Sequence, residues 1–379
     1  MSYFTNVRNG AAAILATAAM STGFVSTASA AELDFGKEGE PIELVVGYQP
    51  YYTEAWSGVV MRDQKLFEKY LPEGSTVKFE IGLQGSVIVN AMLAGKQHIG
   101  YMGDMPAIVS TTKERVAPVS IVATAGLGYD QCNVMLTRTD APEFANADEA
   151  LQWLNGKNVA VPKGACTDRF ARAVFEKENV EPASYLNQNI EVITSGFRAG
   201  KLDAAAIWEP TASRLVLEGL ARRVASGASV DENDGGFLAM RGDLIDQRPD
   251  VVKAWLNAEL DAQLMMADPA NTMKIVEMAK NQTTGFESKV LWKSLAGAYP
   301  EAAGGTPERL ELAFAITPKA AALIEKATPF LHHIKTINVY TLRDDAIRPE
   351  FANEILAERG LTAPIGRIAA QPDSAYQGE

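Results

Sequence analysis

The stretch AGKLDAAAIWEPTAS, residues 199–213, places Trp208 and Glu209 at the end of a short apolar run. An apolar run of this length is typical of a buried strand, and the proline that follows is typical of a helix start. The stretch AGKQHIGYMGDMPAI, residues 94–108, repeats the order with Asp104 as its acid. The two copies therefore predict two similar units in which a strand ends, an acidic residue follows and a helix begins.

Short apolar runs alternate with helical patterns over most of the chain. From residue 249 to about 326 the pattern is helical, and the tail from about residue 348 has the composition of a loop. Because single helices separate the expected strands, these should pair in parallel through right-handed crossovers, and the fold class is α/β. The expected strands are 41–48, 76–82, 98–103, 120–126, 132–138, 158–162, 190–194 and 204–207.

The first thirty residues have the features of a secretory signal peptide. Arg8 precedes the apolar segment AAAILATAAM, and Ala28-Ser29-Ala30 forms a cleavage site of small residues. The apolar segment is too short to span a membrane. We therefore expect residues 1–30 to be removed and the mature protein to be exported and soluble, without a lipid anchor.

Charge and motifs exclude several classes of function. The chain carries 35 Lys and Arg against 47 Asp and Glu, a net charge of −12, which argues against binding nucleic acid or anionic membranes. The three histidines, His98, His332 and His333, have no metal-ligand spacing, and no nucleophile elbow or phosphate-binding loop occurs. We expect no metal, no cofactor and no catalysis.

Two cysteines, Cys132 and Cys166, fall in the mature chain. In an oxidising compartment an even pair is compatible with a disulfide. The alternative is two unrelated small apolar residues. The sequence leaves both possibilities open.

Several loops at the expected carboxyl ends of the strands have unusual compositions. Ligands of open parallel sheets bind at that edge, where Asp104 and Glu209 should also lie. The loop 47–56 contains four aromatic residues, among them Tyr51, Tyr52 and Trp56. Exposed aromatic side chains are favourable where they contact a ligand. The other such loops are 82–86, with free backbone N–H groups ahead of a helix, 126–130, and 163–169.

The order of these pieces resembles the periplasmic substrate-binding proteins of nitrate-, sulfonate- and taurine-type ABC importers over about residues 41–300. The matching segments are VVGY (45–48), LAGK (93–96), GKNVAVPKG (156–164) and AIWEP (206–210). The resemblance implies a two-lobed periplasmic binding protein fold of the cluster II type, with two hinge crossovers and a ligand cleft between the lobes. It implies ligand-binding roles for Gln49, Tyr51, Gln84, Ser86, Asp104, Tyr129, Thr167, Asp168, Trp208 and Glu209.

The acids depart from the pattern of that family. Members that bind oxyanions use Ser and Thr hydroxyls and helix N-termini, whereas this chain has Asp104, Asp130, Asp168 and Glu209 at these places. Free carboxylates with nearby aromatic rings favour a cationic or zwitterionic ligand that contains nitrogen or sulfur. A taurine-like zwitterion with its anionic end on the helix start at Ser86 is compatible with this pattern, and the alternative for each acid is a helix cap or a turn residue.

The resemblance also implies the partners. We expect an extracytoplasmic solute-binding component of an ABC importer, a monomer that meets a membrane permease and ATPase subunits. The alternatives are an enzyme or binding protein related to thiamine-pyrimidine biosynthesis on the same fold, and a periplasmic sensory module.

Two glycine-containing segments divide the chain into the expected lobes. Hinges absorb large backbone changes, and glycine pairs lie near residues 127–131 and 229–237. Lobe 1 should comprise 32–128 and 236–340, and lobe 2 should comprise 129–235. Residues 341–379 should form a C-terminal extension that packs peripherally.

Overall fold

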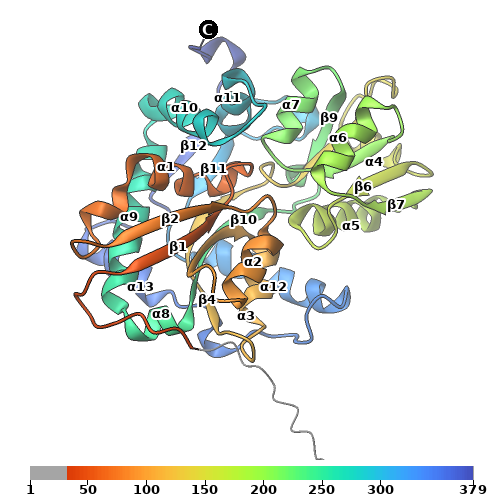
Figure 1. Cartoon of the computed structure of the whole chain (residues 1–379). Coiled ribbons are helices and arrows are strands. Elements are labelled where there is room, and N and C mark those ends of the chain that lie inside the picture. Colours follow the sequence, from red (N-terminus) through yellow and green to blue (C-terminus); the bar gives the residue numbers. More distant parts are fainter. Residues whose placement is uncertain (1–31, 379) are drawn as a thin grey trace, which may run out of the picture.

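The computed structural model describes residues 32–378 (Figure 1), so the expected signal peptide lies outside the described residues. Two separate sheets with helices on their faces confirm the α/β class. Within this range, no helix has both the length and the apolar character that crossing a membrane would require.

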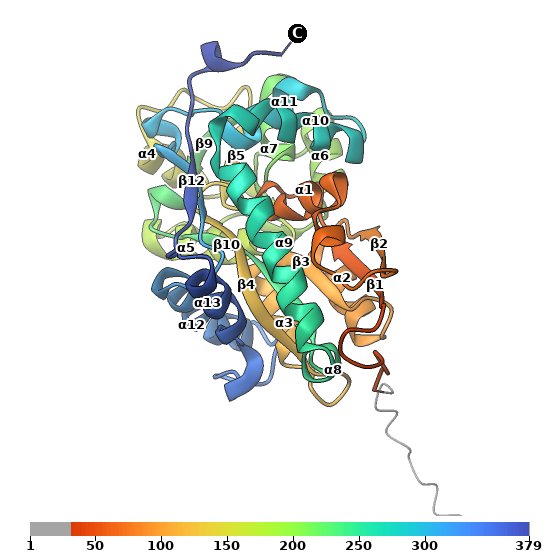
Figure 2. The ribbon, with the colours of Figure 1, turned by 90° about the vertical axis from the view of Figure 1, so that its left-hand side faces the viewer.

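The larger sheet has seven strands in the order β12-β11-β4-β10-β3-β1-β2. Helices α2 (Gly85–Leu93), α3 (Asp104–Thr111) and α12 (Pro318–His333) pack together on one face around an apolar cluster. The long helix α9 (Pro249–Ala267) lies across the other face (Figure 2). The strands are β1 (Glu43–Tyr48), β2 (Thr76–Ile81), β3 (Ile99–Gly103), β4 (Val119–Gly128), β10 (Asp234–Arg241), β11 (Glu308–Leu312) and β12 (Gly366–Ala369).

The smaller sheet has five strands in the order β7-β6-β8-β5-β9. Its strands are β5 (Val134–Arg138), β6 (Asn158–Val161), β7 (Ser184–Asn187), β8 (Ala204–Ile207) and β9 (Ala221–Ser226). Its helices are α4 (Ala147–Gln152), α5 (Cys166–Glu178), α6 (Ile190–Arg198) and α7 (Thr211–Leu217). The remaining helices are α1 (Ser57–Gln64), α8 (Gly242–Gln247), α10 (Thr272–Gln282), α11 (Ser288–Ala296) and α13 (Glu350–Glu358).

Two chain segments connect the sheets, 129–133 between β4 and β5 and 227–233 between β9 and β10. They lie side by side, because the Gly227 amide donates to the carbonyls of Tyr129 at 2.8 Å and Asn133 at 2.9 Å. The glycines that suggested hinges lie instead within paired strands, where Gly126 faces Gly236. A Cβ at either glycine would come within about 3 Å of the Glu54 carbonyl oxygen, so the glycines admit the close approach of the 53–55 turn.

The strand directions correct the expectation of purely parallel pairing. Strand β10 runs antiparallel to both β3 and β4, and β5 runs antiparallel to both β8 and β9. Strands β5 and β10 follow the two segments that connect the sheets, and no α-helix lies between β4 and β5 or between β9 and β10. Both sheets are therefore mixed.

The segment 190–194, expected as a strand, is the first half of helix α6. The Asn189 side chain accepts a hydrogen bond from the Val192 amide at 2.9 Å and caps the helix. Ile190, Ile193 and Phe197 are buried at helical spacing. The strand next to β6 is instead 184–187.

The C-terminal third also contains two strands that the sequence patterns did not predict. Strand β11 lies within the segment expected to be all helical, and β12 pairs with it at the sheet edge. Helix α13 contributes Phe351, Ile355 and other buried apolar side chains, so the tail is ordered rather than a loop.

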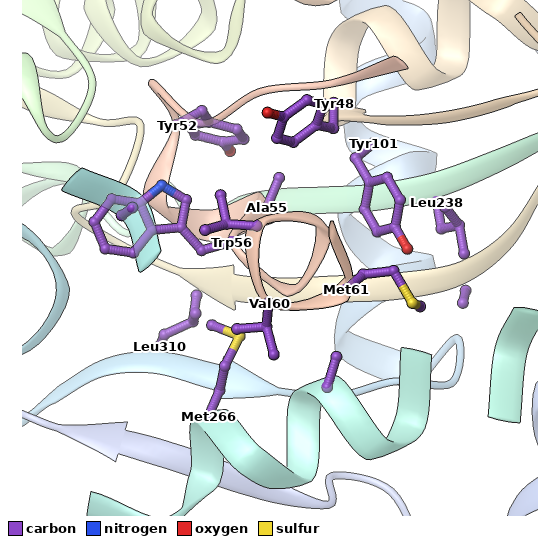
Figure 3. Packing of buried hydrophobic residues seen from close by; sticks show 14 of the residues in the cluster. Tyr48, Tyr52, Ala55, Trp56, Val60, Met61, Tyr101, Leu238, Met266 and Leu310 are labelled. Atoms are coloured by element: carbon purple, nitrogen blue, oxygen red, sulfur yellow. The ribbon is translucent and has the colours of Figure 1, made fainter. Parts of the chain in front are cut away.

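Aromatic side chains near the start of the chain belong to the core of the larger sheet. Tyr48, Tyr52, Trp56 and Tyr101 lie together between the strands and helix α1 (Figure 3). Trp56 is fully buried, and its indole N–H donates to the Pro50 carbonyl at 2.9 Å. This core fixes the loop after β1, which forms one wall of the cavity described next.

Candidate functional site

A cavity of about 400 Å³ lies between the two sheets, next to the connecting segments. Both sheets contribute to its walls, together with the segment that follows α12. Six of the residues expected at the site line it, together with both cysteines. The lining residues include Gln49, Tyr52, Gln84, Ser86, Asn90, Pro106, Cys132, Lys163, Cys166, Asp168, Arg172, Trp208 and Thr336.

Two helix N-termini open toward this cavity, one from each sheet. Helix α2 begins after Gln84 and helix α5 begins after Ala165, and neither of these two residues makes a side-chain capping hydrogen bond. The first N–H groups of a helix have no partner within the helix and carry a partial positive charge. Each helix start can therefore donate hydrogen bonds to an anionic group in the cavity.

The charged side chains that line the cavity are Lys163, Asp168 and Arg172. Asp168 accepts hydrogen bonds from the Gly164 amide, the Arg172 guanidinium and the Tyr185 hydroxyl, so its charge is compensated. Two positive groups and one negative group leave the lining with one net positive charge. The side-chain amides of Gln49, Gln84 and Asn90 add both donors and acceptors.

Asp104 is buried behind this wall rather than in the lining of the cavity. Its carboxylate pairs with the Arg169 guanidinium at 3.0 Å, and Arg169 also pairs with Glu232. Burial raises the pKa of Asp104, and the nearby Arg169 opposes that rise. Arg169 comes from α5 and Asp104 starts α3, so this contact joins the two sheets.

Glu209 and Asp130 form a second buried charge cluster with Arg223 and Arg309. The Glu209 carboxylate lies 3.5 Å from Arg309 and 3.9 Å from Arg223, and it accepts a hydrogen bond from the Ser213 amide at 2.8 Å. Asp130 pairs with both arginines. Burial raises the pKa of Glu209, against the effect of Arg309 and Arg223. Neither acid lines the cavity.

The remaining expected residues lie at other places. Trp56 is in the core, and Thr167 is buried with its hydroxyl 3.5 Å from the Pro162 carbonyl. Tyr129 lies on the first connecting segment, where its hydroxyl is 3.5 Å from Asp231. Tyr51 lines a second cavity, which also includes Trp208 in its lining.

Cys132 and Cys166 are joined by a disulfide with a Cα–Cα distance of 6.1 Å. The bond ties the first connecting segment to the start of α5, and both cysteines line the cavity. The cross-link therefore fixes one of the two helix starts relative to the segment between the sheets.

Sequence reasoning missed several lining residues for identifiable reasons. Asn90 lies one helical turn after Ser86 on α2, and that spacing could have revealed it. Arg172 likewise follows Asp168 by four residues on α5. Thr336 comes from a segment distant in sequence, and no local signal marks it.

A buried acid pair lies beneath the cavity wall. Burial raises the pKa of Glu54 well above its ordinary value, and burial raises the pKa of Asp234 to about 6. Asp234 accepts hydrogen bonds from the amides of Cys132 at 2.7 Å and Asn133 at 2.9 Å, which anchors the first connecting segment to β10. Glu54 also contacts the Tyr52 hydroxyl. No sequence pattern predicts that these two acids lie together.

Comparisons with known proteins give a consistent result. The model of the NMT1-like family matches residues 37–280. The "Taurine-binding periplasmic protein" of Escherichia coli K12 is 24% identical over 255 residues, which cover 64% of this chain and 74% of that protein. The "Putative aliphatic sulfonates-binding protein" of the same organism is 27% identical over 218 residues, which cover 54% of this chain and 61% of that protein.

Solved structures with the same fold include proteins of two kinds. The alkanesulfonate-binding protein SsuA of Xanthomonas axonopodis pv. citri, bound to MOPS, is similar with a TM-score of 0.64 at 19% identity, covering 81% of this chain and 98% of that one. The nitrate-binding protein NrtA of Synechocystis PCC 6803 has a TM-score of 0.68 at 15% identity, with 86% and 92% covered. The desulfurization enzyme DSZB has a TM-score of 0.60 at 15% identity, with 84% and 99% covered.

Proposed function

The chain belongs to the NMT1-like family, among the periplasmic binding proteins of nitrate-, sulfonate- and taurine-type ABC importers, and from this premise we propose that it captures a small organic anion or zwitterion. It acts as the extracytoplasmic solute-binding component and delivers its ligand to a permease with ATPase subunits. The protein works in the periplasm as a monomer, after removal of residues 1–30, and catalyses no reaction. The curated relatives are themselves named as binding proteins, which supports this proposal.

One observation carries the choice of ligand. The helix starts of α2 and α5 converge on a cavity whose side chains carry one net positive charge. The sequence alone favoured a cationic or zwitterionic ligand because it could not show what the acids contact. Since Asp104, Asp130 and Glu209 have guanidinium partners, the argument for a cation loses its basis. The zwitterion alternative is kept, with its anionic end at the helix starts.

We propose that binding closes two lobes. Lobe 1, residues 32–128 and 236–340, contains most of the larger sheet, and lobe 2, residues 129–235, contains the smaller one. The segments 129–133 and 227–233 would serve as the hinge, and residues 341–379 pack against lobe 1. The placement of the cavity between the two sheets supports this arrangement, since closure would exclude water from the ligand.

The first experiment is calorimetric titration of the mature, disulfide-intact protein with methanesulfonate, taurine, nitrate and ethylamine. We expect the sulfonates to bind and ethylamine to fail. Lys163 is exposed at the cavity, and Lys163→Gln should weaken sulfonate binding about two- to fivefold, because a solvent-accessible charge contributes modestly. The exposed Lys201, outside the lining, supplies the matched control Lys201→Gln, which should change nothing. Binding of ethylamine without any sulfonate would contradict the proposal.

A further inference from the structure

A second cavity of about 350 Å³ shares Trp208 with the first as a lining residue. Segments that follow strands of both sheets line it, with Tyr51 and Leu83 after β1 and β2 and Trp208 after β8. Helices α6 and α7 supply one wall, and the loop between α10 and α11 supplies the other. Nothing in the proposed function requires this second space.

Arg214 on α7 is a half-buried cation in this cavity that forms no ion pair within the described chain, although the carboxylates of Glu218 and Glu191 oppose the lowering of its pKa. Among residues 32–378 no carboxylate lies within ion-pair distance of it, and its Nε atom is buried without a hydrogen-bond partner. The other arginines between the sheets, Arg169, Arg223 and Arg309, all have carboxylate partners. Burial also lowers the pKa of Arg214 from its ordinary value. A cation held in this way lacks the partner that buried charges normally have.

A second polar group in the same cavity is also unpartnered. Thr194 on α6 lines the cavity and is 5% exposed. Its hydroxyl has no hydrogen-bond partner among the described residues. Most buried hydroxyls have a partner, so an unpaired one that lines a cavity is available to a ligand. The Arg214 guanidinium and the Thr194 hydroxyl can both donate to an anionic oxygen.

The rest of the lining is aromatic. The Arg214 guanidinium lies 4.5 Å from the Phe286 ring centroid, and the ring of Tyr51 lies 5.8 Å from that of Phe286. Trp208 adds a third aromatic side chain to the lining. An apolar or aromatic body would be desolvated there while its charged end reached Arg214.

The charge of the lining agrees with an anion. Arg198, Arg214 and Glu191 are its charged members, which gives one net positive charge. Arg198 is already paired with Glu218 at 3.0 Å. Arg214 is therefore the cation that remains available.

We propose that this cavity is a second binding compartment for an organic anion with an aromatic or apolar body. The charged group meets Arg214 and Thr194, and the body lies against Trp208, Tyr51 and Phe286. The proposal deepens the proposed function and rests on it, because it assigns this protein a wider class of anions than the first cavity alone would take. Since both sheets form the walls, an occupant would also hold them together.

The test compares benzenesulfonate with methanesulfonate on the mature, disulfide-intact protein by calorimetry. We expect wild type to bind benzenesulfonate in the presence of saturating methanesulfonate. Arg214→Gln should weaken benzenesulfonate about ten- to a hundredfold, which corresponds to losing a charge-assisted hydrogen bond, and should leave methanesulfonate unchanged. Thr194→Val should weaken benzenesulfonate by a smaller factor, and Arg214→Lys should retain part of the affinity.

The exposed Arg115, which lines neither cavity, supplies the control Arg115→Gln, and the melting temperature of each variant reports whether it folds. Full competition between the two sulfonates would overturn the second compartment and leave the proposed function standing. Equal loss of both ligands in Arg214→Gln would also overturn it, because the arginine would then act on the sheets as a whole. If neither sulfonate binds wild type, the second compartment fails, and the proposed function fails with it where taurine and nitrate do not bind either.

Discussion

Replacing Glu209 by glutamine should destabilise the folded protein. The side chains of Glu209, Asp130, Arg223 and Arg309 are at most 2% exposed, and they form a cluster of two carboxylates and two guanidiniums. The substitution leaves two positive charges against one negative charge in a buried site. Asp130 already pairs with both arginines and cannot balance them alone.

The expected cost follows from the geometry. Removing one partner of a buried ion pair costs about 3–5 kcal/mol, because the charge left behind has lost its compensation. Glutamine keeps an oxygen that can accept from the Ser213 amide, which Glu209 now does at 2.8 Å. Burial raises the pKa of Glu209, so the carboxylate itself is held at a desolvation cost that glutamine avoids. We therefore expect the lower end of the range, about 3 kcal/mol.

Urea unfolding at neutral pH measures this cost, with sulfonate affinity measured on the same protein. The matched control is Glu218→Gln, because Glu218 is 38% exposed and pairs with Arg198 on the surface. That change should cost under about 1 kcal/mol. If Glu209→Gln loses less than about 1 kcal/mol and abolishes sulfonate binding, the carboxylate faces the ligand and the cluster argument is wrong.

Three further changes test other parts of the structure. Arg169→Met should cost about 3–5 kcal/mol in urea unfolding, since it leaves two buried carboxylates without their guanidinium, and a surface-like cost would refute the buried pairing. Cys132→Ser with Cys166→Ser should cost about 3–4 kcal/mol from the 34-residue separation, and an unchanged unfolding midpoint in oxidised protein would exclude the bond. Burial raises the pKa of Glu259 to about 7, so its contribution to stability is present below about pH 4 and lost as pH rises through 7. Glu259→Gln should therefore reduce the difference in unfolding free energy between pH 4 and pH 8 by about 3 kcal/mol, and parallel pH profiles would contradict the shift.

The sequence predicted those elements whose signal is local. Five strands lie where the sequence predicts them, because a buried strand is a short apolar or alternating run. These are β1, β2, β3, β6 and β8. The direction of β10 could not be read in this way, because its neighbours β3 and β4 lie more than a hundred residues earlier in the chain. The strand prediction for 190–194 was wrong because it followed the β-branched residues of that segment. The Asn189 cap and the helical spacing of the buried positions indicate a helix instead.

The candidate site divides along the same line. Gln84, Ser86 and Trp208 follow or precede elements whose ends the sequence marks, and they line the cavity. For Asp104 and Glu209, the sequence placed each acid after the end of a strand, but it could not show which way the side chain faces. Their guanidinium partners are remote, for Arg309 lies one hundred residues after Glu209 and Arg169 lies 65 residues after Asp104.

The two similar stretches of sequence share a structural role that neither reveals alone. Asp104 follows a strand of the larger sheet and pairs with Arg169 of the smaller sheet's α5. Glu209 follows a strand of the smaller sheet and contacts Arg309 on β11 of the larger sheet. Each acid therefore reaches a guanidinium from the opposite sheet, and the contacts are reciprocal.

Reciprocal pairs of this kind fix geometry more than they add stability. An intact buried pair gains little over its solvated ions, because desolvation offsets most of the attraction, whereas removing one partner is costly. If the sheets move apart, the side chains of the pairs Asp104–Arg169 and Glu209–Arg309 become hydrated again. The pairs therefore determine how the two sheets are positioned relative to each other, but they add little net free energy to the closed arrangement. On the proposed closure, the free energy that selects the closed arrangement would then come from the ligand, through its hydrogen bonds to the helix starts of α2 and α5.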